Sequence, residues 1–234
     1  MKTKHLLNDS YAIRLKNISK RYEIHHEKPT LVEKFIHGKN EIFWALDNVN
    51  LTINKGERVG IVGPNGSGKT TLLKIIAGIT SPTIGTIETY GKVVSLIDLE
   101  AGFHEDLSGY DNIFLNGMLL GMTKAEIMHR LPDIIAFADI KQFIDVPLFT
   151  YSFGMKLRLG FAIAIHANPD TLILDEGFGV GDANFRKKSL AALNKLKKNK
   201  TIIVTSHEPQ LIQKYCEKII LLKNGVMHQT KHVK

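Results

Sequence analysis

The stretch that most constrains the fold of this 234-residue chain is GPNGSGKTT at positions 63–71. It matches the pattern G-x-x-x-x-G-K-S/T, which binds phosphate where it follows a strand and opens a helix. The preceding ERVGIVG has the apolar content of a buried strand, and the following KTTLLKIIAGI has a helical pattern. We therefore expect a nucleotide site in which backbone N–H groups at the start of that helix contact phosphate oxygens.

Each residue of this loop has an expected part in binding. Lys69 would neutralise charge on the β- and γ-phosphates and assist catalysis, and the Thr70 hydroxyl would ligate Mg²⁺. The predicted nucleotide-binding residues are Gly63, Pro64, Asn65, Gly66, Ser67, Gly68, Lys69, Thr70 and Thr71.

Two further apolar stretches end in polar side chains suited to phosphate chemistry. TLILDE ends in Asp175, placed to complete the coordination of Mg²⁺, and Glu176, which would polarise the attacking water as general base. TIIVTSH ends in His207, whose imidazole would reach the γ-phosphate. We predict catalytic roles for Glu176 and His207, and a metal-binding role for Asp175.

The rest of the chain indicates an α/β fold. Residues 12–22 and 45–53 alternate apolar and polar positions, as half-buried strands do. Later strands alternate with helices, which favours a mostly parallel sheet covered on both faces. A helical block at about 101–165 interrupts this order as a subdomain, and Pro132 is expected to bend or break one of its helices.

An insertion at about 23–43 separates the first two strands. Pro29 followed by an apolar stripe and Gly38 predicts an amphipathic helix of one or two turns. Core packing and contact with a partner are both open readings of this helix.

The amino-acid composition excludes few classes of protein. No stretch approaches the ~18 consecutive apolar residues of a membrane-spanning helix. The lone Cys216 excludes an internal disulfide and suits a reducing compartment. The net charge of +8 fits either solvated helix faces or an anionic partner.

Taken in order, the phosphate loop, YSFGM at 151–155, LILDE and TSH resemble the ATP-binding subunits of ABC transporters. The resemblance implies a single domain over 1–234, with a P-loop (RecA-like) parallel core, an antiparallel β subdomain and an ABC-type helical subdomain. It implies a homodimer binding ATP and Mg²⁺, in which Ser152 and Gly154 of one subunit face the nucleotide of the other. Tyr22 would stack on adenine, and VGDA at 180–183 would cross the dimer interface.

Within that family, three stretches resemble exporters of O-antigen, capsule or teichoic acid: YSFGMKLRLGF, LIDLEAGFHEDLSGYDNIFLNG and the 23–43 insertion. This resemblance implies a peripheral subunit on the cytoplasmic face of the bacterial inner membrane. It would bind two copies of a membrane permease and drive a lipid-linked glycan outward, with no nucleic-acid partner.

The chain departs from the family pattern at two places. Where most members have a metal-contacting glutamine, this chain has Leu99 and Glu100, so Glu100 takes the metal role in our prediction. Phe153 occupies a position that is usually small.

Three alternative functions stay open at this point. The first is an ABC importer or drug exporter, and the second is an ABC-type ATPase acting on nucleic acid. The third is a simple P-loop kinase or GTPase, although NKLK at 194–197 lacks the acid of a guanine motif.

Overall fold

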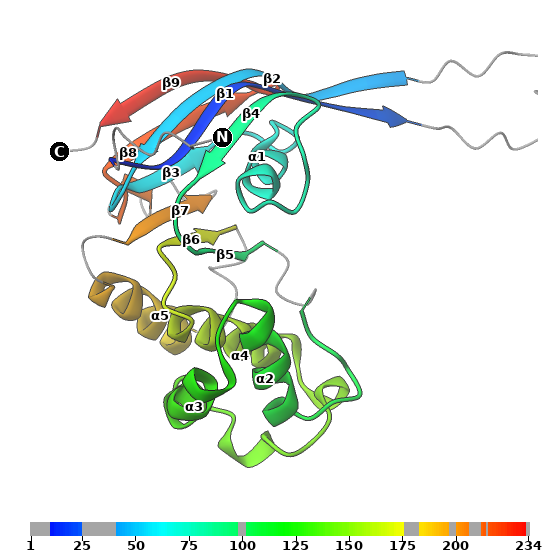
Figure 1. Cartoon of the computed structure of the whole chain (residues 1–234), viewed down its shortest axis with the longest axis vertical. Coiled ribbons are helices and arrows are strands. Elements are labelled where there is room, and N and C mark those ends of the chain that lie inside the picture. Colours follow the sequence, from blue (N-terminus) through cyan, green and yellow to red (C-terminus); the bar gives the residue numbers. More distant parts are fainter. Residues whose placement is uncertain are drawn as a thin grey trace, which may run out of the picture.

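A computed structural model describes residues 10–24, 41–97, 102–175, 183–196, 200–205, 212–213 and 215–232 of the protein. Two β-sheets lie against each other, with α1 beside them (Figure 1). The helices α2 to α5 form a lobe below the strands in this view. The predicted α/β fold is confirmed.

The larger sheet has six strands in the order β5-β6-β7-β3-β8-β9, and only β8 and β9 pair antiparallel. Its strands are β3 Arg58–Val62, β5 Val93–Leu96, β6 Thr171–Leu174, β7 Thr201–Thr205, β8 Lys218–Lys223 and β9 Val226–His232. Both faces are covered, because Leu172 and Leu174 pack into one hydrophobic cluster and Ile173 into another. Continuous apolar strands thus produce the expected parallel core.

The smaller sheet is antiparallel, in the order β2-β1-β4, with β1 Tyr11–Ile24, β2 Glu41–Asn54 and β4 Ile84–Thr89. Its inner face packs on β3 and on α1 Lys69–Ile76, through buried residues such as Ile13 and Leu72. β1 and β2 are longer than the predicted strands, and their outer ends form a two-stranded ribbon that projects from the molecule (Figure 1).

The remaining helices are α2 Gly109–Leu119, α3 Lys124–Ala138, α4 Phe153–His166 and α5 Ala183–Lys195, with 3₁₀ turns η2 Lys141–Phe143 and η3 Leu148–Thr150. Ser108, Thr123 and Ser152 cap α2, α3 and α4 through their hydroxyl groups. α3 continues past Pro132, so the expected break does not occur there. Across the described ranges, none of the helices has the length and apolarity to cross a membrane.

Several predicted features lie outside the described residues. They are the insertion helix at 29–38, Glu100, Glu176, residues 180–182 and His207.

Candidate functional site

The phosphate loop joins the C-terminal end of β3 to the first turn of α1, as its sequence predicts. Gly68 precedes the helix with φ 99°, a left-handed conformation that favours glycine. A Cβ at Gly68 would collide with the Ala45 carbonyl oxygen, and one at Gly63 would collide with the Leu222 carbonyl oxygen. Strands β2 and β8 therefore lie directly against the loop and leave no room for side chains there.

The Lys69 ammonium is held on the inside of the loop. The side chain is buried, and its Nζ donates hydrogen bonds to the carbonyl oxygens of Gly63 at 2.9 Å and Pro64 at 3.1 Å. A buried ammonium needs such acceptors to offset the loss of hydration. The loop itself thus fixes the cation at the position where the sequence predicts phosphate.

Thr70 and Asp175 come together from different parts of the chain. The Thr70 hydroxyl donates to Asp175 Oδ2 at 3.3 Å, and the Thr205 hydroxyl donates to Asp175 Oδ1. Asp175 follows β6, and Thr205 ends the neighbouring β7. Two hydroxyl groups therefore orient one carboxylate beside the first turn of α1.

A cavity of about 290 Å³ opens over the loop, lined by residues 65–71 together with Phe43 and Ala45. This volume is near the lower end of the range for ligand pockets. Ser67 lines the cavity and is 2% exposed, yet its Oγ has no hydrogen-bond partner in the described part of the chain. A buried hydroxyl without a partner is costly, so Ser67 indicates a ligand with hydrogen-bonding groups at this place.

Two cavity residues, Phe43 and Ala45, were not among the predicted binding residues. Both belong to β2, and Phe43 is 47% exposed as a residue. Tyr22, the predicted adenine contact, does not line the cavity but pairs directly with Phe43 across the ribbon. The run IFWA was the available sequence signal, because four successive apolar residues depart from the apolar–polar alternation of a half-buried strand.

The predicted signature residues open α4. Ser152 is its N-cap, with Oγ accepting from the Met155 N–H at 3.2 Å, and the Phe153 side chain is 58% exposed. The buried Tyr151 hydroxyl donates to the Phe143 carbonyl oxygen at 2.6 Å, and burial raises the pKa of Tyr151 to about 12. Ser152 and Gly154 do not line the cavity over the phosphate loop.

The two basic residues of this helix form ion pairs within the chain. Lys156 Nζ donates to Glu105 Oε1 and Oε2 at 2.7 and 2.8 Å, and its side chain is only 15% exposed. Arg158 lies 3.9 Å from the Asp139 carboxylate. These ion pairs hold the first turns of α4 against neighbouring segments, and the helix begins at the exposed residues Ser152 and Phe153.

A phosphate loop between strand and helix, a hydroxyl–carboxylate pair beside it and a mixed β-sheet define a P-loop nucleotide-binding cassette. Residues 46–179 match the family described as ABC transporter, and the chain belongs to that family. The family predicted from the sequence motifs is therefore confirmed.

The relatives carry names from polysaccharide export. The chain is 46% identical over 202 residues to the O-antigen export system ATP-binding protein RfbB of Myxococcus xanthus, covering 84% of this chain and 46% of that protein. It is 42% identical over 224 residues to the teichoic acids export ATP-binding protein TagH of Bacillus cereus, covering 94% and 40%. The chain thus spans less than half the length of these two relatives.

A shorter relative and a solved structure match over nearly their whole length. The O-antigen export protein RfbB of Klebsiella pneumoniae is 35% identical over 222 residues, covering 91% of this chain and 90% of that protein. The dimeric post-hydrolysis structure of the ATP-binding cassette MJ0796, bound to ADP and Pi, superposes with a TM-score of 0.78 and 26% identity. That superposition covers 95% of this chain and 99% of the cassette.

Proposed function

We propose that this chain hydrolyses ATP and uses the free energy to power export of a lipid-linked polysaccharide across the cytoplasmic membrane. The observation that carries the ATPase part is the convergence of Lys69, Thr70 and Asp175 beside one cavity. The export part is supported by the O-antigen and teichoic acid names of the relatives.

Binding is assigned to the loop and the start of α1. Backbone N–H groups of residues 65–71 and the helix N-terminus would contact the phosphates, with Lys69 opposite the β- and γ-oxygens. Of the two proposed catalytic residues, Glu176 would orient water and His207 would contact the γ-phosphate. Both assignments rest on the family resemblance and lie outside the described residues.

The described residues fit a magnesium ion. The Thr70 hydroxyl and the Asp175 carboxylate are adjacent oxygen donors, and Mg²⁺ prefers oxygen ligands. When bound, the ion would neutralise charge on the β- and γ-phosphates. Thr70 and Asp175 would hold it, with Glu100 proposed as a further ligand.

A second copy of the chain would complete the site. Ser152 and Gly154 begin α4 away from the cavity over the loop, so another subunit is needed to bring them to the nucleotide. The dimeric form of the similar cassette MJ0796 supports this arrangement. The proposed unit is a homodimer with two composite ATP sites.

The proposed partners are two copies of a membrane permease at the cytoplasmic face of the cell membrane. Closure of the ATP-bound dimer would move the permease, and hydrolysis would reset it. The glycan would pass through the permease, so no chemistry on the glycan is assigned to this chain.

The ATPase part is tested by ATP hydrolysis of the purified protein beside Lys69→Ala, with Lys74→Ala as control. Lys74 lies in the last turn of the same helix, so its loss matches the charge change without touching the loop. We expect Lys69→Ala to be inactive and Lys74→Ala to match the unaltered protein. An active Lys69→Ala variant would refute the assignment of the site.

The export of polysaccharide is tested in proteoliposomes that contain this chain assembled with its proposed permease. A lipid-linked polysaccharide should stimulate ATP hydrolysis several-fold, and a hydrophobic drug or an amino acid should not. Stimulation by either of the latter would make this an ABC transporter of another substrate class.

A further inference from the structure

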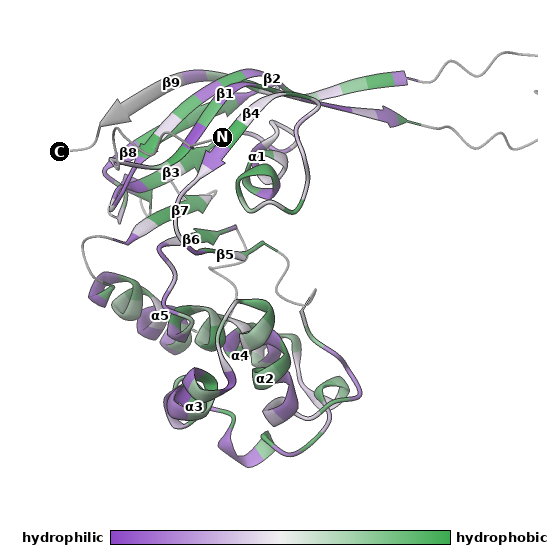
Figure 2. Cartoon of the chain, in the orientation of Figure 1, coloured by the Kyte–Doolittle hydropathy of each residue, from purple (hydrophilic) through white to green (hydrophobic). Residues whose placement is uncertain are grey.

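Thr205 ends β7 with a hydroxyl group on a face of the sheet that is otherwise apolar. Side chains along a strand alternate between the two faces, so Thr205 shares its face with Ile203, and the parallel register places it beside Ile61 of β3. Both isoleucines are fully buried in the cluster that contains the apolar residues of α1. Figure 2 shows hydrophobic residues along β6 and the middle of β7. Thr205 is itself 1% exposed, so its hydroxyl is a polar group in apolar surroundings.

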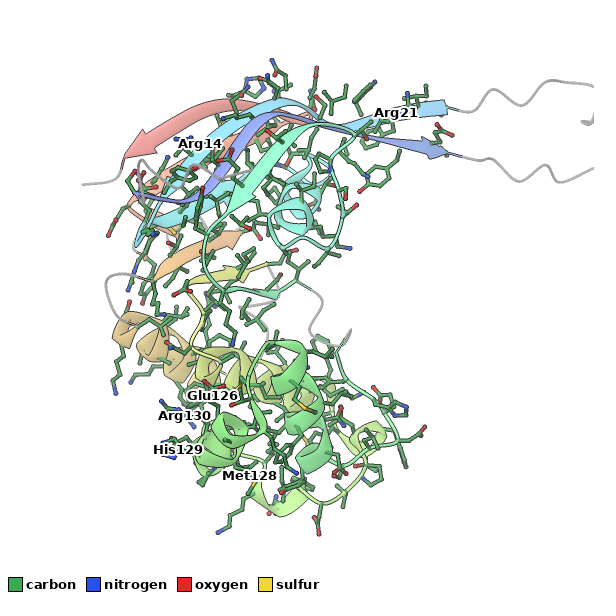
Figure 3. All side chains as sticks on the ribbon, viewed as in Figure 1. Arg14, Arg21, Glu126, Met128, His129 and Arg130 are labelled. Atoms are coloured by element: carbon green, nitrogen blue, oxygen red, sulfur yellow. The ribbon has the colours of Figure 1, made fainter. Side chains whose placement is uncertain are left out.

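A buried hydroxyl needs a hydrogen-bond partner, and the partner of Thr205 is the carboxylate of Asp175. Asp175 follows Ile173 by two positions, which directs both side chains to the face covered by α1. From the neighbouring strand, Thr205 Oγ1 donates to Asp175 Oδ1. The labelled Glu126 and Arg130 lie in the helical lobe, well apart from β6 and β7 (Figure 3), so their charges do not orient this carboxylate.

The two carboxylate oxygens of Asp175 therefore have different partners. Oδ1 accepts from Thr205, whereas Oδ2 accepts at 3.3 Å from the Thr70 hydroxyl in the first turn of α1. Thr70 is exposed and lines the cavity over the phosphate loop, while Thr205 is buried. Oδ2 is thus the oxygen on the side of the nucleotide site, and the Thr205 hydroxyl keeps it there by holding the other oxygen.

We propose that Thr205 is a positioning residue for magnesium, which holds the Asp175 carboxylate so that Oδ2 is presented to the ion. This inference rests on the proposed ATP site and adds the residue that orients its metal ligand before the nucleotide binds. Loss of a hydrogen bond to a ligating carboxylate typically costs about 10–100-fold in metal affinity or activity. Valine is close to threonine in shape but lacks the hydroxyl, so Thr205→Val removes this donor alone.

The test compares the binding of ADP with and without the metal ion. Calorimetric titration of the full chain with ADP in EDTA measures contacts to the phosphate loop, and titration with MgADP adds the contact through the ion. We expect Thr205→Val to weaken MgADP binding about tenfold and to leave the binding of metal-free ADP within about twofold. Thr205→Ala should give the same result with a smaller side chain, and Thr205→Ser, which keeps the hydroxyl, should restore MgADP binding.

Thr201→Val is the matched control, because Thr201 begins the same strand and is likewise 1% exposed. Its hydroxyl accepts from the Gly56 N–H at 3.0 Å, at the opposite end of β7 from Asp175. Urea unfolding should show similar losses of stability in Thr201→Val and Thr205→Val. Thr201→Val should nevertheless bind ADP and MgADP with the affinities of the unaltered protein.

Unchanged MgADP binding in Thr205→Val, or equal losses for ADP and MgADP, would overturn the inference while the ATP site stands. So would a Thr205→Ser variant as weak as Thr205→Val, or equal affinities of the unaltered chain for ADP and MgADP. Failure of the unaltered chain to bind either ligand would overturn the proposed function, and this inference with it.

Discussion

The side chains of Thr70 and Asp175 meet over 3.3 Å although the residues lie 105 positions apart in the chain. β3 and β6 run parallel in one sheet with β7 between them, so their C-terminal ends reach the same edge. Ligand sites in open α/β sheets form at that edge, outside the carboxyl ends of the strands. A hydroxyl in the first turn of α1 and a carboxylate after β6 thus become one oxygen-rich site.

Asp175→Asn should abolish most of the ATPase activity while keeping the fold. The amide retains the size of the carboxylate but loses the charge that balances a divalent cation. We expect the rate to fall at least about 100-fold and the magnesium requirement to rise. ATP hydrolysis measured against magnesium concentration provides the readout.

Asp170→Asn serves as the control for that variant, because Asp170 precedes the opposite end of β6 and bonds the Lys92 N–H and Lys200. Its magnesium dependence should match that of the unaltered protein. A normal magnesium profile in Asp175→Asn would refute the metal assignment.

Gly68→Ala should disrupt the loop rather than leave it slightly strained. A methyl group there would meet the Ala45 carbonyl oxygen in a backbone conformation that non-glycine residues rarely adopt. We expect nucleotide affinity to fall more than about tenfold and unfolding free energy to drop by about 1–3 kcal/mol. Gly78→Ala is the comparison, since Gly78 has φ 74° but nothing within 4 Å of an added Cβ. Gly78→Ala should lower the unfolding free energy by about 1 kcal/mol and keep full nucleotide affinity. Equal losses of nucleotide affinity in Gly68→Ala and Gly78→Ala would contradict this account of the loop.

Tyr151 gives the protein a specific loss of stability at high pH. Burial raises its pKa from the ordinary value of 10.0 to about 12, so the unfolded chain ionises at lower pH than the folded protein. Below pH 10 the neutral Tyr151 hydroxyl makes its full contribution to the stability of the folded protein. This contribution to the unfolding free energy is lost as the pH rises through about 12. The difference in unfolding free energy between the unaltered protein and Tyr151→Phe should shrink by on the order of 1 kcal/mol between pH 9 and 12. Urea unfolding across that range measures it, and an advantage independent of pH would be contrary to the argument.

Lys188 of α5 forms hydrogen bonds with the C-terminal end of α3. Its Nζ donates to the carbonyl oxygens of Ala136 at 3.1 Å and Phe137 at 2.8 Å, and lies 4.8 Å from the centroid of the Phe137 ring. A cation at a helix C-terminus satisfies carbonyl groups that have no intrahelical partner. Lys188→Met should therefore lower the unfolding free energy by about 0.5–1.5 kcal/mol in urea titrations. Lys187→Met makes the same charge change at an exposed neighbouring residue and should lower the unfolding free energy by less than half as much. Equal losses of unfolding free energy in the two variants would argue against the contact between Lys188 and α3.

Much of this architecture could be predicted because its signals are local. The phosphate loop, the apolar strand before Asp175 and the capped helices each follow from a few adjacent residues. Phe43 was missed because its place depends on the pairing of β1 with β2 and on a bulge at Ala45, which are properties of two distant segments. Pro132 was expected to bend or break a helix, and no break occurs because α3 packs against α4 with its own residues Ile127 and Ile134 fully buried.

The most direct test of a composite-site ATPase is the hydrolysis rate per subunit measured across protein concentration, beside the dimer mass of Glu176→Gln in ATP. The account predicts a rate per subunit that rises with concentration, and an inactive variant that accumulates as an ATP-bound dimer. A rate independent of concentration, from a protein that stays monomeric with an active Glu176→Gln variant, would contradict it.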